Sequence, residues 1–139
     1  MTPEDYTKRN EGIRYRPYLC SAKRITIGWG RNLQDNGISR DEAEYLFRND
    51  WNRAVRSCLD VVPGFDRLSE PRRAVLIDMA YQLGGIGLWR FERMLAAVRR
   101  GDFDLAAREI LDSKYAREDS PGRAARNAEM MRTGEWQDS

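Results

Sequence analysis

The sequence of 139 residues contains no histidine. This absence excludes catalytic sites that depend on an imidazole, namely Ser-His-Asp hydrolases, Cys-His peptidases and zinc enzymes with histidine ligands. The only cysteines, Cys20 and Cys58, would make a poor zinc site on their own, so we expect no metal and no other cofactor. Acid and base chemistry must therefore come from carboxylates, assisted by thiol, hydroxyl, tyrosine or lysine groups.

Cysteines and long hydrophobic runs are both scarce. Two cysteines do not make a disulfide framework in a chain of this size, so we expect two free thiols. No stretch approaches the roughly 18 apolar residues of a membrane span, and the polar start MTPEDYTKRNEG lacks the apolar core of a signal peptide. We therefore expect synthesis in the cytoplasm without a signal peptide and no stable association with a membrane.

An excess of charge of one sign is also missing. Lys and Arg total 24 against 22 acidic residues, and the net charge of +2 gives only a weak preference for anionic polymers. We expect local clusters such as Arg72-Arg73 to be solvated helix faces, and we expect no nucleic-acid partner. With 41% hydrophobic and 33% charged residues, the chain has the composition of a folded globular domain.

Local signals predict a mainly helical α+β chain. Thr2-Pro3-Glu4-Asp5 begins a helix that ends at Gly12, and Tyr18 to Trp29 is strand-like, with glycines at 28 and 30. Several helices follow. The first begins with a capping box at 39–42 and has Cys58 on its core face, and the second has a cap at Ser69, an apolar run at 74–83 and a stop at Gly84-Gly85. Further helices are expected at 89–100, from Asp104 to about 116, and at 121–132, where Ser120 is the cap.

This order predicts a single domain over 1–139 with two lobes. A small β-containing lobe covers about 12–38, and a larger helical lobe consists of 1–11 and 39–139. We expect a ligand cleft between the two lobes. Glu11 lies at the end of the first helix, where the negative end of the helix dipole favours the protonated acid that a proton donor requires.

A longer pattern surrounds this glutamate. Eight residues separate Glu11 from Cys20, five separate Cys20 from Thr26, TIGWG follows at 26–30, and RTGEW stands at 132–136. Further matching segments are DEAEYLF at 41–47, MAYQLG at 79–84 and SPGRA at 120–124. With these segments the chain resembles the phage-type lysozymes, the muramidases similar to the lysozyme of phage T4, over nearly its whole length.

The resemblance implies a lysozyme-like fold and an endolysin-type muramidase. Such an enzyme hydrolyses the β-1,4 bond between N-acetylmuramic acid and N-acetylglucosamine in bacterial peptidoglycan. Glu11 would be the proton donor and Thr26 would hold water or stabilise the reacting centre. The family's inverting scheme places the second group about 6.5–9.5 Å from the acid, whereas retaining pairs stand about 5–5.5 Å apart.

Cys20 occupies the family position at which aspartate is commoner. A thiol is a poorer base than a carboxylate, and its ordinary pKa of about 8.5 leaves it mostly protonated at neutral pH. We expect the neighbouring cationic side chains to lower this pKa, and these are Arg14, Arg16, Lys23 and Arg24. Positioning of water, electrostatic stabilisation and nucleophilic attack all stay open for Cys20.

Four further positions match functional or structural residues of the family. Arg123 matches the arginine set against the acid, Tyr81 and Gln82 match residues that line the cleft, and Asn32 is a substrate-binding candidate. For Tyr81, a place in the core of a buried helix is an equally good interpretation. Arg31 stands where many relatives have histidine, so an ion pair there would not depend on histidine titration.

Two other functions compete with a hydrolase. A lytic transglycosylase also uses one catalytic glutamate but leaves a 1,6-anhydro product, and a non-catalytic glycan-binding module would have kept the cleft without the chemistry. We expect a monomer whose partner is the peptidoglycan glycan strand. An enzyme that acts on the periplasmic cell wall but lacks an export signal would depend on a holin to permeabilise the membrane. The alternative is a lysozyme that is part of the virion.

Overall fold

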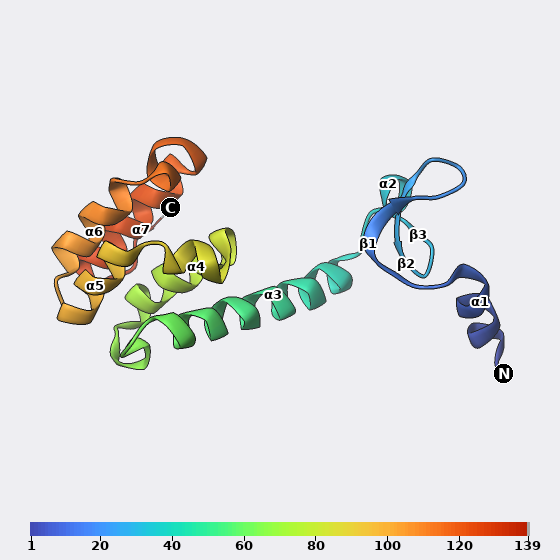
Figure 1. The fold of residues 1–139 in the computed structure, drawn as a ribbon, viewed down its shortest axis with the longest axis horizontal. Helices are drawn as coiled ribbons and strands as arrows, with labels where there is room; N and C mark the ends of the chain where they lie inside the picture. Colours follow the sequence, from blue (N-terminus) through green and yellow to red (C-terminus); the bar gives the residue numbers. More distant parts are fainter. Residues whose placement is uncertain (139) are drawn as a thin grey trace. The chain divides into compact units, whose positions relative to one another are not determined.

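A three-stranded antiparallel sheet follows the first helix of the chain. The computed structural model describes residues 1–138 and places α1 at Pro3–Glu11, β1 at Arg14–Leu19, β2 at Ile25–Gly28 and β3 at Arg31–Asn32 (Figure 1). Strand β2 is central, and Thr26 pairs with Tyr18 of β1 on one side and with Asn32 of β3 on the other. Residues paired in this way present their side chains on one face of the sheet.

The predicted start of α1 is confirmed in detail. Thr2 Oγ1 accepts a hydrogen bond from the Asp5 N–H at 3.0 Å, and Asp5 accepts one from the Thr2 N–H at 3.0 Å. This reciprocal capping box satisfies two backbone donors that the first turn leaves free, and Pro3 supplies a preformed helical φ. The helix therefore begins at the expected residue and ends at Glu11, before Gly12.

A second capping box begins the longest helix. After the short α2 at Leu33–Asn36, Ser39 and Glu42 exchange bonds between side chain and backbone at 2.8 and 3.2 Å, and α3 runs over Arg40–Val61. Contacts divide the chain within α3 into two compact units, unit 1 over Met1–Leu46 and unit 2 beginning at Phe47. The sequence predicts instead that residues 1–11 join the helical lobe in one domain, and this stays a prediction.

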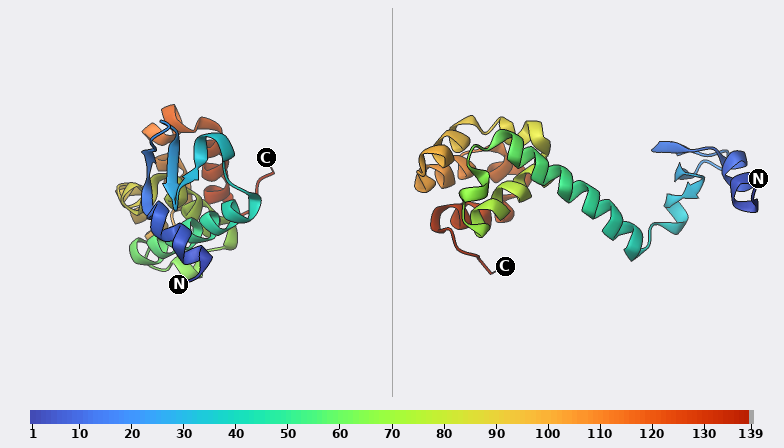
Figure 2. Two further views of the ribbon diagram at one scale, coloured as in Figure 1. Left: turned by 90° about the vertical axis from the view of Figure 1, so that its right-hand side faces the viewer. Right: turned by 90° about the horizontal axis from the view of Figure 1, so that it is seen from below.

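Unit 2 is a bundle of helices around a buried core. Figures 1 and 2 show α5, α6 and α7 side by side in this bundle. Cys58 is fully buried on the core face of α3, as predicted. The elements after α3 are η1 at Phe65–Arg67, α4 at Glu70–Trp89, α5 at Glu92–Arg100, α6 at Phe103–Leu111, the π-helical η2 at Tyr115–Asp119 and α7 at Pro121–Thr133. The largest fully buried side chains are Leu76, Met79, Leu88, Met94, Ile110 and Met131.

The predicted stop at Gly84-Gly85 is only a kink, and the predicted helix start at residue 89 is wrong. Gly84 takes φ 79°, a conformation that favours glycine, but the helix resumes and continues to Trp89. Gly85 lies against α3, where an added Cβ would lie 2.7 Å from Ser57 Oγ. Helix α5 starts at Glu92 because Phe91, with ψ 56°, leaves the helical region.

Two predictions near the C-terminus also need correction. The helix expected to reach about residue 116 ends at Leu111, where Ser113 Oγ donates to the Ile110 carbonyl at 2.6 Å and accepts from the Ala116 N–H. The Ser113 side chain thereby bonds to backbone groups that would pair with other backbone groups in a continuing helix. Ser120 precedes α7 as expected but does not cap it, because its hydroxyl accepts a hydrogen bond from Gln82 at 2.6 Å.

The predicted fold class is confirmed, since a small N-terminal sheet accompanies a mainly helical chain. Ser69 caps α4, and Gly134 follows the last residue of α7, as the sequence predicts. Among the described residues, no helix combines the length and the apolar composition that crossing a membrane requires.

Candidate active site

Glu11 is the last residue of α1, and its side chain is exposed. Gly12 takes φ 68°, and its N–H donates to the Lys8 carbonyl at 2.8 Å, which ends the helix. The Glu11 carboxylate lies against the backbone of Gly30, where a Cβ would lie 2.5 Å from Glu11 Oε2. The turn after β2 therefore contacts the predicted acid.

Thr26 is the buried polar residue of the sheet, with 3% of its surface exposed. Its hydroxyl donates to the Arg24 carbonyl at 2.8 Å. Because β2 is the central strand, Thr26 is held by backbone pairing on both sides, opposite Tyr18 and Asn32. Thr26 is thus fixed in place, as a group that positions water must be.

Cys20 lies at the start of the hairpin loop between β1 and β2. Its N–H donates to the Arg24 carbonyl at 3.0 Å, and Lys23, which takes φ 60°, donates its N–H to the Cys20 carbonyl at 2.8 Å. The backbone of Arg24 and then the side chain of Thr26, polar groups beside the sulfur, lower the pKa of Cys20. The structure therefore brings the predicted second and third catalytic residues together.

The cause of this lowered pKa differs from the expectation. Neighbouring cationic side chains were predicted to lower the pKa of Cys20, but polar backbone and hydroxyl groups of the hairpin do so. The Arg24 guanidinium instead pairs with Asp35 at 3.6 Å. The Thr26 hydroxyl has a single proton, so hydrogen bonding to a Cys20 thiolate requires it to release the Arg24 carbonyl.

The two thiols should differ strongly in reactivity. Cys20 is half-buried with a lowered pKa, whereas burial raises the pKa of Cys58 to about 12. Since the thiolate is the reactive form, iodoacetamide at neutral pH should modify Cys20 at least about tenfold faster than Cys58. Mass spectrometry of tryptic peptides measures both rates, and denaturant should make them similar. An intact mass two hydrogens short, or equal native rates, would contradict two free and unequal thiols.

Asn32 joins this group through its place opposite Thr26, but its amide already has a structural task. The side chain accepts from the Asp35 N–H at 3.0 Å and donates to Asp35 Oδ2 at 2.9 Å, capping α2. Asn32 also lines a hollow of about 1120 Å³ in unit 1, with Trp29 and Tyr45. Its substrate-binding role stays a prediction, and glycan contact would compete with the cap.

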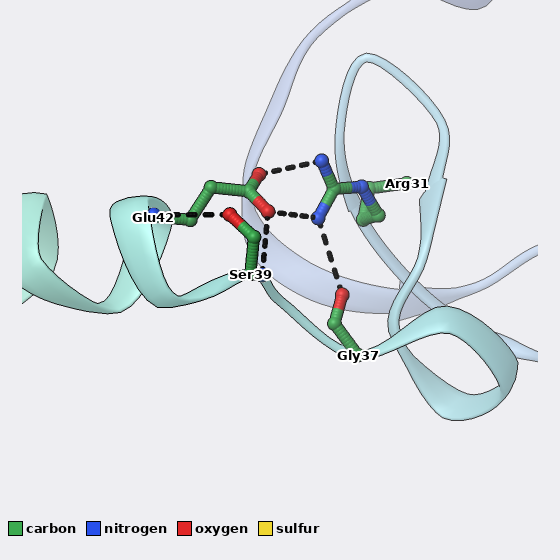
Figure 3. Close-up of polar contacts among 4 residues, drawn as sticks. All are labelled: Arg31, Gly37, Ser39 and Glu42. Carbon is green, nitrogen blue, oxygen red and sulfur yellow. Dashed lines mark hydrogen bonds and ion pairs between the residues drawn. The ribbon is translucent and has the colours of Figure 1, made fainter.

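Arg31 forms the ion pair that the sequence suggested, and its partner is Glu42. The two terminal guanidinium nitrogens donate to the two carboxylate oxygens at 2.9 and 2.5 Å, and one of them also donates to the Gly37 carbonyl (Figure 3). The bonds from Arg31, followed by the Ser39 N–H, hold the pKa of Glu42 down at about 2. This cluster joins β3 to the first turn of α3 within unit 1.

The depressed pKa of Glu42 predicts a loss of stability in acid. The stabilisation from this group is fully present above the ordinary pKa of 4.5 and disappears as the pH falls through about 2. Glu42→Gln should therefore lower the Tm by a few degrees at neutral pH, and the difference from wild type should vanish near pH 2. Thermal melts across pH 2–7 measure this, with the exposed Glu44→Gln as control. A constant difference at all pH values would contradict the pairing.

Two predicted residues line a hollow of about 570 Å³ within unit 2. These are Tyr81, which is 40% exposed, and Arg123. The Tyr81 ring packs against Phe47, with centroids 5.7 Å apart, and Trp51 and Trp136 complete an aromatic lining. The exposure favours the ligand-facing interpretation of Tyr81 over the buried-core alternative. Aromatic faces of this kind suit the apolar faces of sugar rings.

Arg123 has a carboxylate partner in its own unit that the sequence analysis missed. Its guanidinium donates twice to Asp78, at 2.7 and 2.5 Å, and Asn127 donates to the same carboxylate at 2.9 Å and to Tyr115 Oη. Burial opposes the charge of Asp78, but these bonds outweigh it and lower the pKa of that carboxyl. The proposed contact of Arg123 with Glu11 stays a prediction.

Gln82 is held by the residue that was expected to cap α7. Its Nε2 donates to Ser120 Oγ at 2.6 Å, whereas its Oε1 is buried and has no hydrogen-bond partner among the described residues. A buried acceptor without a donor carries a free-energy cost. The predicted site residues thus form two groups: Glu11, Cys20, Thr26 and Asn32 in unit 1, and Tyr81, Gln82 and Arg123 in unit 2.

Comparison with known proteins places the chain in a family. The family model described as phage lysozyme matches residues 8–129. The chain is also similar to the pre-baseplate central spike protein Gp5 of Enterobacteria phage T4, with 27% identity over 96% of this chain. The aligned part covers 28% of that relative, so the chain spans less than a third of its length. Since the family match includes the end of α1, the sheet and most of the helical bundle, the chain belongs to the phage lysozyme family, a family of glycoside hydrolases.

Proposed function

We propose that this chain is a muramidase that hydrolyses the β-1,4 bond between N-acetylmuramic acid and N-acetylglucosamine in peptidoglycan. Membership of the phage lysozyme family is the observation that carries the proposal. The geometry of unit 1 supports it, because Glu11 ends α1 against Gly30, and Cys20 and Thr26 meet at the hairpin. The substrate is the glycan strand of the bacterial cell wall.

In the proposed reaction, Glu11 gives its proton to the glycosidic oxygen as the bond to the leaving sugar breaks. Positive charge then develops at the anomeric carbon, and water attacks from the opposite face of the ring, which inverts the configuration. Thr26, fixed in the central strand, and Cys20 beside it orient this water. The chemistry requires no imidazole, in agreement with a sequence that contains none.

Three residues are proposed to hold the glycan. Gln82, which is half-buried, matches a cleft-lining position of the family, and the exposed Tyr81 ring suits a sugar face. Asn32 offers an amide, at the cost of its cap on α2. Arg123 is proposed to position the acid as well as to pair with Asp78.

Mass spectrometry of digested peptidoglycan tests the proposed reaction. Hydrolysis adds one water to each cut and leaves a reducing end, which sodium borohydride converts to an alcohol. A lytic transglycosylase would leave 1,6-anhydro ends that resist this reduction, and a glycan-binding module would release no fragments. Reducible ends on N-acetylmuramic acid are the expected result, and either of the other results would overturn the hydrolytic assignment.

A virion-associated setting for this activity is favoured by one observation, the similarity to a spike protein of the phage T4 baseplate. The alternative is a free endolysin that depends on a holin to reach the wall. Proteomics of purified virions separates the two settings, because peptides of this chain in stoichiometric amounts are expected only for a virion component. We expect a monomeric catalytic unit in both settings.

A further inference from the structure

The turn between β2 and β3 contacts α1 at two places on its last turns. Gly28 ends β2, Arg31 begins β3, and Trp29 and Gly30 form the connection. Trp29 meets Lys8 on α1, and Gly30 meets Glu11. Lys8, Glu11, Trp29 and Gly30 all belong to unit 1.

Gly30 leaves room for the carboxylate of Glu11. An added Cβ would lie 2.5 Å from Oε2 and 2.9 Å from Cδ, closer than Cβ atoms approach other atoms in proteins. The φ of Gly30 is 77°, so the position also favours glycine through its backbone. Gly28 has a similar φ of 70°, yet nothing lies within 4 Å of its added Cβ. The two glycines share a backbone requirement, and only an added Cβ at position 30 would force the Glu11 carboxylate to move.

Trp29 holds the same helix one turn earlier. The Lys8 ammonium lies 4.8 Å from the centre of the Trp29 ring, and Glu4 pairs with the same ammonium at 3.0 Å. Cation–π contacts of this type are favourable even at exposed sites. The last turn of α1 is therefore attached to the turn through Trp29 while Gly30 receives the carboxylate.

We propose that Gly30 is a positioning residue for Glu11, and that the Trp29-Gly30 turn sets the distance and direction of this carboxylate relative to Thr26 on the adjoining strand. This inference rests on the proposed function, in which Glu11 is the proton donor. A side chain at position 30 would displace the acid instead of merely straining the turn. A misplacement of about 1 Å costs on the order of a hundredfold in rate when a reacting group must be aligned.

Gly30→Ala and the matched control Gly28→Ala test the proposal by kinetics on soluble glycan oligomers from peptidoglycan. We expect Gly30→Ala to lower kcat about 10- to 100-fold with KM nearly unchanged, and Gly28→Ala to lower kcat less than about threefold. In a Glu11→Asp background the acid is one methylene shorter, so Gly30→Ala should then cost less than about threefold. Equal costs in the two backgrounds would show a structural effect only and would overturn the proposal.

Two further measurements separate failure of this inference from failure of the proposed function. The Glu11 carboxylate is the far end of an exposed side chain and can move aside, so Gly30→Ala and Gly28→Ala should lower the Tm by similar amounts, through the positive φ that both glycines share. If Glu11→Gln removes lysis while Gly30→Ala keeps the kcat of Gly28→Ala, the acid assignment stands and Gly30 does not position Glu11. If Glu11→Gln stays active, the acid assignment itself is wrong.

Discussion

Replacing Glu11 by glutamine should reduce cell-wall lysis by about 10²- to 10⁴-fold, the usual contribution of a positioned general acid. Glutamine keeps the shape of the side chain, so it still fits against Gly30, but an amide has no proton of suitable acidity to give. The side chain is exposed, and the helix around it is fixed by the Thr2 capping box and by Gly12. The fold should therefore survive the change with little effect on the Tm.

A turbidity assay on cells with a permeabilised outer membrane measures this loss, and circular dichroism checks the fold. Glu44→Gln is the matched control, because it removes one exposed carboxylate of unit 1 from a position outside the proposed site. It should keep full activity. A folded Glu11→Gln variant with substantial lysis would remove Glu11 from the role of acid, whatever the family membership of the chain.

Local features were predictable from sequence because each depends on residues close together in the chain. The capping boxes at Thr2 and Ser39 join a side chain to a backbone group three residues away. Gly12 and Gly134 take a positive φ that ends α1 and α7, and this conformation does not depend on residues distant in the sequence. The strand region was also predicted, although β1 begins at Arg14, before the alternating pattern becomes visible.

Partners distant in sequence were harder to predict. Arg123 and Asp78 are 45 residues apart, and Gln82 and Ser120 are 38 apart, so no spacing rule connects them. Ser120 in particular has the sequence signature of a helix cap, but its hydroxyl accepts a hydrogen bond from the half-buried Gln82 instead. The partner of Arg31 is closer, 11 residues away, and it was missed because Glu42 was interpreted only as a capping residue.

The environment of Cys20 shows the same limit. Sequence reasoning counted the nearby cationic residues, whereas polar groups of the hairpin, the Arg24 backbone first and the Thr26 side chain second, lower the pKa of Cys20. Composition does not reveal how the hairpin places these groups. A deprotonated sulfur would here accept hydrogen bonds as an aspartate carboxylate does, which explains how one site accommodates either residue.

Exchanging Cys20 for aspartate and for alanine should give opposite results. If Cys20 orients water or stabilises charge, Cys20→Asp keeps activity near that of the wild type, because a carboxylate at this position also accepts hydrogen bonds from water and neighbouring donors. Cys20→Ala retains the hairpin but offers no acceptor, so kcat should fall about 10²-fold or more. Since the side chain is only half-buried, both variants should fold, which thermal melts will check.

The stereochemistry of the product distinguishes this role from nucleophilic attack. A nucleophilic sulfur would displace the leaving sugar, form a glycosyl thioether and then yield to water, so the product would keep the β configuration. Proton NMR of the first-formed anomer reads this directly, and we expect the α anomer, as inversion requires. A retained β anomer together with a trapped thioether on Cys20 would overturn the inverting assignment. An alanine variant as active as the wild type would instead remove Cys20 from the reaction and leave Glu11 and Thr26 as its proposed catalytic groups.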